Sequence, residues 1–216
     1  MKSENYIPAL SYDWLTPFYD SVVGFTTRER LFKQALVLQA GIESDHRILD
    51  LGCGTGTLTI LLKEVAPLAD VVGLDGDPEI LKIAREKVRE RCLKIDLDEG
   101  MSFNLPYQDT SFHRVVSSLF FHHLTTENKI KTLGEIKRVL KPEGEFHVAD
   151  WGKPSSSLMK LCSRLIQLLD GYETTADNFD GLVPQLMKQA GFEEIEETHD
   201  FNTLFGTIRL HRSRKL

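Results

Sequence analysis

The chain has few cysteines and no long apolar run, and these two absences exclude several classes of protein. Its 216 residues include three cysteines, Cys53, Cys92 and Cys162, with no C-x-x-C pair and no histidine at metal-ligand spacing. A disulfide framework, a structural zinc site and any other metal site are therefore not expected, and unpaired thiols are typical of a reducing compartment. No apolar run approaches the length of about 18 residues that a membrane span needs, and the N-terminal residues do not resemble a signal peptide. We expect a soluble, cytoplasmic protein without a membrane span.

Basic residues are also in short supply. Lys and Arg number 26 against 32 Asp and Glu, which gives a net charge of −6, and basic residues cluster only after Leu210. Nucleic acids and anionic lipid surfaces attract proteins through clustered cations. The sequence therefore predicts no nucleic-acid partner, and it leaves the oligomeric state open.

No repeat and no Pro- or Ser-rich linker divides the chain, so we expect one domain over residues 1–216. From residue 46 onward, apolar runs alternate with stretches of helical period. This alternation predicts an α/β, Rossmann-like fold with a mostly parallel sheet and helices on both faces. The last two predicted strands are only three residues apart and should pair antiparallel. Strands are predicted at 47–51, 71–74, 93–99, 114–118, 145–149, 194–199 and 203–210, and helices at 57–65, 78–91, 127–140, 158–170 and 181–190.

Four parts of this domain have distinct predicted roles. Residues 1–45 are rich in aromatic side chains and are predicted to form a helical lid over a substrate pocket, with packing in the core as the alternative. Residues 46–150 form the predicted cofactor-binding core. Residues 151–180 form a helical insertion, and residues 181–216 form the final helix and β-hairpin.

The strongest functional signal is a glycine loop between the first strand and the first helix of the core, Asp50-Leu51-Gly52-Cys53-Gly54-Thr55-Gly56. Glycines allow a sharp turn and let a ligand approach backbone N–H groups at the helix N-terminus. The second strand ends at Asp75, where a carboxylate can accept hydrogen bonds from ribose hydroxyls. Together the loop and the acidic strand end predict a nucleoside ligand.

The details of the loop argue against a nicotinamide dinucleotide as that ligand. The dinucleotide fingerprint G-x-G-x-x-G requires glycine at the position of Thr57. Asp50, at the mouth of the loop, would repel a diphosphate but attract a cationic amine. A nucleoside that carries an amino acid and a sulfonium, S-adenosylmethionine, suits both Asp50 and Asp75.

These motifs resemble the class I S-adenosylmethionine-dependent methyltransferases, and most of all the ubiquinone/menaquinone-biosynthesis-type branch that methylates small molecules. The resemblance extends over about residues 12–150 and, more loosely, 175–210. It implies a seven-stranded sheet with the last strand antiparallel, S-adenosyl-L-methionine as cofactor, and methyl transfer to a small-molecule acceptor. A non-catalytic cofactor-binding protein is the alternative, and a nicotinamide-dependent oxidoreductase is less favoured. Besides the loop and Asp75, the matching motifs are Leu105-Pro106-Tyr107, Ser111-Phe112 and Arg138-Val139-Leu140-Lys141-Pro142.

The resemblance also implies roles for individual residues. Asp50 would orient the amine and Asp75 the ribose. Met101 and Ser102 would flank the adenine, and Met101 departs from the Asp or Asn that is frequent in the family at this position. The methionine portion would lie against Gly52, Gly54, Thr55, Gly56 and Ser118.

Two adjacent histidines are the candidates for a catalytic base. His122 and His123 follow the fourth strand, and a neutral histidine can take a proton near neutral pH. Because neighbours on an extended chain point to opposite sides, we expect at most one of them to face the pocket. Packing or a structural hydrogen bond is the alternative role, and Tyr19 and Asp150 are the other candidate bases.

Overall fold

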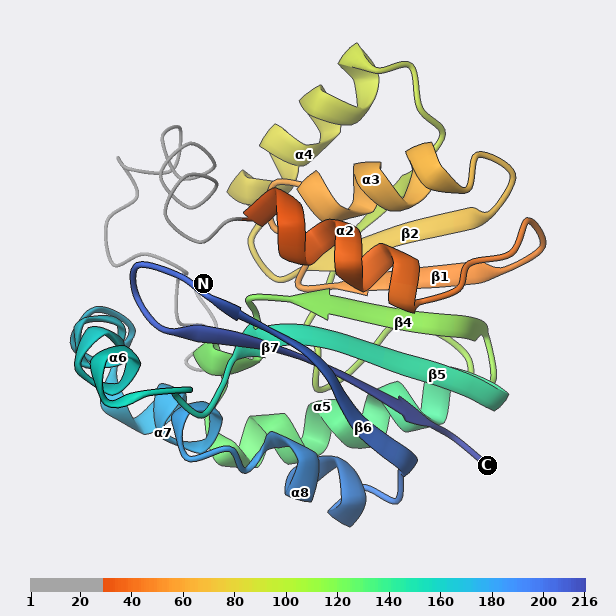
Figure 1. The fold of residues 1–216 in the computed structure, drawn as a ribbon. Coiled ribbons are helices and arrows are strands. Elements are labelled where there is room, and N and C mark those ends of the chain that lie inside the picture. The colour runs from red at the N-terminus through yellow and green to blue at the C-terminus, as the bar shows by residue number, and fades with distance from the viewer. Residues whose placement is uncertain (1–28) are drawn as a thin grey trace.

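The computed structural model describes residues 29–216, so Tyr19 and the first 28 residues of the predicted lid lie outside the described residues. Within 29–216, no helix is long and apolar enough to cross a bilayer. Strands and helices alternate along the chain (Figure 1). The strands are β1 (Arg47–Leu51), β2 (Asp70–Asp75), β3 (Asp96–Glu99), β4 (Phe112–Ser118), β5 (Leu140–Trp151), β6 (Glu193–Asn202) and β7 (Thr207–Arg214). The helices are α2 (Glu29–Gln39), α3 (Thr57–Val65), α4 (Pro78–Glu90), the 3-10 turn η2 (Phe121–His123), α5 (Thr126–Val139), α6 (Ser157–Asp170), α7 (Tyr172–Phe179) and α8 (Val183–Gln189).

The strands form one seven-stranded sheet in the order β3-β2-β1-β4-β5-β7-β6. β7 pairs antiparallel with both β5 and β6, while the other neighbours pair parallel. The predicted mostly parallel sheet with an antiparallel last strand is confirmed. The strand order reverses between β1 and β4, and in open α/β sheets such a reversal opens a crevice at the carboxyl ends of the strands.

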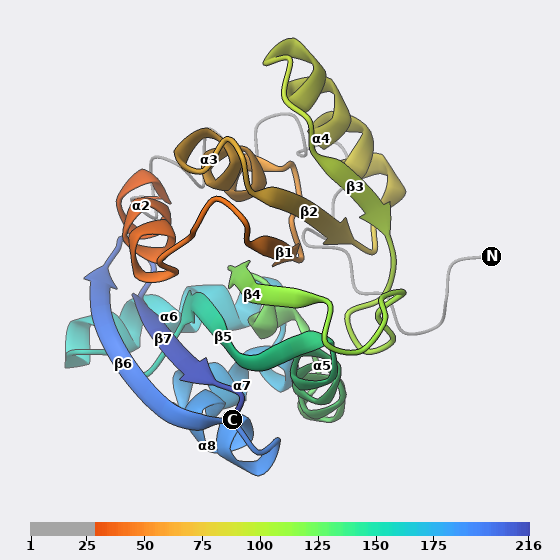
Figure 2. The same ribbon diagram turned by 90° about the vertical axis from the view of Figure 1, so that its right-hand side faces the viewer.

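Each face of the sheet carries its own apolar core. Leu49 and Leu51 of β1 pack with α5 and α8, whereas Ile48 packs with Phe32 of α2 and Leu62 of α3. Figures 1 and 2 show α2 and α3 on one side of the sheet and α5 and α8 on the other. Because both faces are covered, the central strands are continuous apolar runs in the sequence. Phe32 belonged to the aromatic-rich segment, and in the structure it is a fully buried core residue.

Several element boundaries follow local signals in the sequence. The bounds of β1 and α3 match the predicted ranges to the residue. Asp77 is the N-cap of α4: its carboxylate accepts hydrogen bonds from the backbone N–H groups of Glu79 and Ile80, and Pro78 begins the helix. Thr125 caps α5 in the same manner.

The structure differs from the predicted boundaries at several places. β5 begins at Leu140, directly after α5, because Leu140 already pairs with β4. The final hairpin turns at 203–206 rather than 200–202, because residues up to Asn202 remain in the ladder with β7. The helical insertion contains a second helix, α7, which is separated from α6 by Gly171 with a φ of +93°.

A buried ion pair fastens α7 to α5. The fully buried ammonium of Lys129 donates to the carbonyl oxygen of Thr174 at 2.7 Å and to Oδ2 of Asp177 at 3.2 Å. Burial lowers the pKa of Lys129, and the nearby Asp177 carboxylate opposes that shift. A buried cation is stable only with such partners. The pair therefore holds α7 on α5, and α7 also contacts η2, which carries both candidate histidines.

Candidate functional site

The glycine loop links β1 to α3 at the point where the strand order reverses. Gly52, Gly54 and Gly56 all have positive φ angles, +70°, +53° and +78°. A left-handed backbone at three positions in five residues suits glycine and turns the chain sharply into α3. The loop therefore places its backbone at the carboxyl end of the sheet, between β1 and β4.

Gly52 also permits a close approach between the loop and the segment that follows β4. A Cβ atom at this position would lie 2.3 Å from Cγ of Phe120. Phe120 precedes η2, so the absence of a side chain at Gly52 lets the histidine turn pack directly beside the glycine loop. Sequence reasoning did not identify Phe120, because its contact with the loop depends on a long-range approach of two segments.

Asp50 is a buried carboxylate with one unpaired oxygen. Thr59 of α3 donates its hydroxyl hydrogen to Oδ2 at 2.6 Å, while Oδ1 is buried and has no hydrogen-bond partner among residues 29–216. Burial raises the pKa of Asp50 to about 6, against the opposing hydrogen bond from Thr59. A buried acceptor without a partner is costly. The oxygen is thus suited to a ligand that brings a cationic N–H group.

Asp75 closes the other side of the loop. Its Oδ2 accepts a hydrogen bond from the backbone N–H of Gly54 at 2.8 Å, and its Oδ1 accepts one from that of Asp77 at 3.0 Å. Burial raises the pKa of Asp75, against these backbone hydrogen bonds. Each carboxylate oxygen has a further lone pair, so both can still accept a ribose hydroxyl.

The remaining predicted cofactor residues lie around this edge of the sheet. Met101 packs against Gly76, immediately after Asp75. The hydroxyl of Ser102 lies 2.9 Å from that of Thr132 on α5. Thr55 is a buried member of the loop, and Ser118 is the last residue of β4, half-buried and in register with Ala149 of β5.

The two histidines lie together rather than on opposite sides of the chain. They belong to the 3-10 turn η2, and their ring centroids are 3.9 Å apart. The premise of an extended chain does not hold at this turn, and the expectation that at most one of them faces the pocket stays a prediction. Nε2 of His123 is buried and has no hydrogen-bond partner within the described part of the chain. Burial and the neighbouring His122 lower the pKa of His123 well below its ordinary value.

His122 forms a buried pair with Asp150, the penultimate residue of β5. Nδ1 of His122 lies 2.6 Å from Oδ1 of Asp150, and both side chains are almost fully buried. The same carboxylate accepts hydrogen bonds from the backbone N–H groups of Phe120, His122 and Trp151. An ionised carboxylate only accepts, so this network assigns the hydrogen of the neutral ring to Nδ1 and the lone pair to Nε2.

Known proteins match the chain in sequence and in fold. Residues 48–144 match the family model described as a methyltransferase domain. The demethylmenaquinone methyltransferase of Deinococcus radiodurans is 35% identical over 137 residues, which are 63% of this chain and 56% of that protein. The chain thus spans little more than half the length of this relative.

Two solved structures share the fold at low sequence identity. One is a SAM-dependent methyltransferase from Aquifex aeolicus, with a TM-score of 0.68 and 20% identity, over 95% of this chain and all of that one. The other is the 4+2 cyclase SpnF, with a TM-score of 0.74 and 21% identity, over 94% of each chain. The presence of a cyclase shows that this fold is not confined to proteins named as methyltransferases. On sequence and fold together, the chain is similar to the class I S-adenosylmethionine-dependent methyltransferases, and its sequence relatives are of the ubiquinone/menaquinone type.

Proposed function

We propose that the protein transfers a methyl group from S-adenosyl-L-methionine to a small-molecule acceptor. The observation that carries this proposal is the buried Asp50 carboxylate, whose Oδ1 has no partner among the described residues and which lies where the glycine loop begins. When bound, the cofactor supplies an electrophilic methyl group on a sulfonium. Asp50 would hold the amine, and Asp75 the ribose.

The other predicted residues would complete the cofactor site. The methionine portion would lie along Gly52, Gly54, Thr55 and Gly56, and against Ser118 at the end of β4. Met101, beside Gly76, would cover the adenine. Ser102 would contribute its backbone there, because its hydroxyl already bonds Thr132. The protein would then align donor and acceptor and exclude water, which is how most of the rate of such a transfer arises.

Formation of S-adenosylhomocysteine tests the activity. The purified protein is incubated with labelled S-adenosylmethionine and a panel of reduced 1,4-naphthoquinols and other phenols, and methylated product is identified by mass spectrometry. Binding without product across the panel would favour a non-catalytic cofactor-binding protein. Binding of NAD in place of S-adenosylmethionine in a thermal-shift titration would favour the oxidoreductase.

A quinone-type acceptor is the first to test. The relative from Deinococcus radiodurans is named for demethylmenaquinone. The methyl group would pass from the sulfonium to an electron-rich ring carbon, with loss of the C–H proton of that carbon to a base or to water. The acceptor form would therefore be the quinol, produced by an external two-electron reductant such as dithionite. Independence from nucleic acid and a cytoplasmic location both remain predictions.

Replacing Asp75 by Ala should weaken S-adenosylhomocysteine binding by about 1.5–3 kcal/mol, the range for hydrogen bonds to a charged group. Isothermal titration measures the effect. Asp70→Ala, at the exposed opposite end of β2, is the matched control and should bind normally. An unchanged dissociation constant in folded Asp75→Ala would remove this residue from the site.

The pKa of Asp50 gives the binding a pH dependence. In the free protein this pKa is raised from 3.8 to about 6, so a cationic amine must displace a proton below about pH 6. Affinity should therefore fall by up to about tenfold per pH unit below 6, with proton release on binding, and should be flat above 7. Titrations in buffers of different ionisation enthalpy measure both effects.

The raised pKa of Asp50 weakens ligand binding at low pH, but it makes the ligand-free fold more stable there. Between pH 3.8 and about 6 the folded protein binds more protons at Asp50 than the unfolded chain does. This group therefore stabilises the ligand-free fold as pH falls through 6, and the contribution is lost as pH rises. In Asp50→Asn this part of both dependences should disappear. If Asp50→Asn keeps the full pH dependence of binding, another group is responsible.

A further inference from the structure

Helix α6 exposes large apolar side chains along one side. Leu158, Leu161 and Leu168 have exposed fractions of 63%, 62% and 81%, and Tyr172, just beyond the helix, is 70% exposed. The three leucines are spaced by three and seven residues, so they lie on one helical stripe. We call Leu158, Leu161, Leu168 and Tyr172 the leucine face. A surface helix normally turns its apolar stripe to the core, so this face lacks the usual cover.

The opposite side of α6 already packs against the core of the protein. Ser163 and Ile166 are buried, and Ile166 joins the core that contains Trp151 of β5 and Phe179 of α7. Leu158 and Leu161 therefore cannot reach that core without turning the helix and exposing Ile166. Their exposure follows from how α6 packs, and no segment among residues 29–216 covers the leucine face.

A row of cations borders the leucine face. Lys160 and Arg164 are four residues apart, both exposed, and they are the charged residues among the described side chains of α6. The chain as a whole has a net charge of −6, whereas both of these described charged side chains of α6 are basic. Apolar side chains beside Lys and Arg, with a tyrosine at the end, are typical of helices that lie in a membrane interface.

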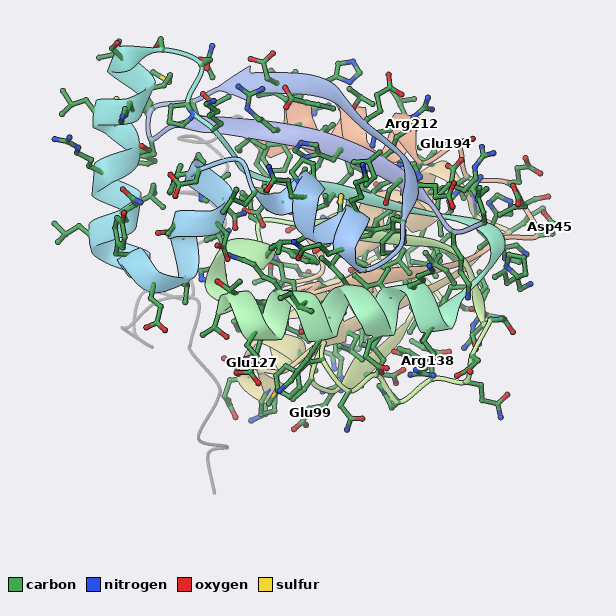
Figure 3. All side chains as sticks on the ribbon, turned by 90° about the horizontal axis from the view of Figure 1, so that it is seen from below. Asp45, Glu99, Glu127, Arg138, Glu194 and Arg212 are labelled. Carbon is green, nitrogen blue, oxygen red and sulfur yellow. The ribbon has the colours of Figure 1, made fainter. Side chains whose placement is uncertain are left out.

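The position of α6 relates the leucine face to the proposed site. α6 follows β5 after a short connection, at the same edge of the sheet at which the glycine loop and the His122–Asp150 pair lie (Figure 1). Its side chains project outward at the rim of the molecule (Figure 3). An object bound to this face would therefore lie beside the entrance to the carboxyl-end crevice.

We infer that α6 docks the protein on the surface of a lipid bilayer with anionic headgroups. The leucines and Tyr172 would enter the boundary between headgroups and acyl chains, and Lys160 and Arg164 would contact lipid phosphates. Because the net charge of the chain is negative, insertion of the apolar side chains contributes more to the binding free energy than attraction between charges does. Delivery of the substrate rests on the proposed function: a lipid-soluble quinol would reach the site directly from the bilayer.

Vesicle flotation with the full chain tests the docking without cofactor or acceptor. The protein should float with vesicles of phosphatidylcholine and phosphatidylglycerol, and more weakly with phosphatidylcholine alone. L161Q/L168Q should weaken the binding by about tenfold or more, because burying one leucine is worth at least that factor. K160Q/R164Q should remove the preference for phosphatidylglycerol. Glutamine is a good helix former, so both variants should keep the fold, and circular dichroism checks this.

Leu68 provides the matched control. It is 82% exposed and lies between α3 and β2, at the opposite edge of the sheet. Leu68→Gln should float like the unmodified protein. The inference is overturned if the unmodified protein does not float, if Leu68→Gln loses as much binding as L161Q/L168Q, or if light scattering shows a dimer that L161Q/L168Q dissociates.

Cofactor binding separates this inference from the proposed function. L161Q/L168Q should bind S-adenosylhomocysteine normally and should methylate a water-soluble quinol normally, but it should lose turnover of a quinol embedded in vesicles. If the unmodified protein binds no S-adenosylhomocysteine, the proposed function fails while the flotation result stands. Equal turnover of the embedded quinol by both proteins would overturn delivery from the bilayer.

Discussion

Replacing His122 by Gln is expected to lower kcat by about 10²–10⁴-fold, the usual contribution of a general base, with little change in cofactor affinity. A quinol or phenol must lose its O–H proton as the methyl group arrives. Asp150 holds the hydrogen on Nδ1 of His122, which leaves the lone pair of Nε2 to take that proton. Glutamine keeps hydrogen-bonding capacity but has no basic lone pair.

Asp150→Asn should produce a loss of similar size through the orientation of His122. An amide NH₂ opposite Nδ1 would force that nitrogen to accept, so the ring hydrogen would move to Nε2 and the base would be lost. Nitrogen NMR of the His122 ring reports this tautomer change without cofactor or turnover. The amide oxygen, in the place of Oδ2, can still accept from the backbone N–H groups of Phe120 and His122, so the turn should keep its shape, whereas the N–H of Trp151 loses its acceptor Oδ1.

Glu145→Gln is the matched control for Asp150→Asn. Oε2 of Glu145 lies 3.1 Å from Nε2 of the fully buried His147, also on β5, so the same chemical change is made at another histidine–carboxylate pair. This variant should keep the pH profile of the unmodified protein. If His122→Gln retains near-full kcat between pH 6 and 9 while binding S-adenosylhomocysteine, alignment alone carries the reaction and the assignment of His122 is wrong.

The fold was predictable where local sequence patterns determine it. Buried parallel strands are continuous apolar runs, and the Asp77–Pro78 cap fixes the start of α4. The end of β6 was not predictable in this way, because residues up to Asn202 stay extended only through pairing with β7. The start of β5 depends likewise on pairing with β4. Partners remote in sequence decide these boundaries.

The residues of the candidate site likewise fall into those that local sequence patterns predict and those that depend on partners remote in sequence. Asp50, Asp75 and the three loop glycines stand at fixed positions in a strand–loop–helix unit, so their proximity follows from chain order. The partners that define their chemistry come from elsewhere. Asp150, on β5, was considered as a base, but only the three-dimensional arrangement pairs it with His122. The hydrogen bond from Thr59 to Asp50 crosses from α3 to β1, and no motif identifies it.

Gly52→Ala is expected to destabilise the fold by about 2–5 kcal/mol, which combines a left-handed alanine with an overpacked contact. The φ of Gly52 is +70°, and its new Cβ would lie 2.3 Å from Cγ and 2.8 Å from Cβ of Phe120. Cβ of Phe120 cannot move away by a change of side-chain rotamer. The loop or η2 must shift instead, so cofactor binding and the position of His122 should both be disturbed.

Gly54→Ala separates the two contributions. Gly54 also has a positive φ, +53°, but a Cβ there meets no atom within 4 Å. It should therefore cost only the conformational part, about 1–2 kcal/mol. Chemical denaturation measures both variants, and Phe120→Ala should relieve part of the cost of Gly52→Ala in the double variant, since it removes Cγ and the ring. Equal destabilisation by Gly52→Ala and Gly54→Ala, with no relief from Phe120→Ala, would mean that glycine is needed at position 52 for its backbone conformation alone. In that case the close approach would not be what couples the loop to the histidine turn.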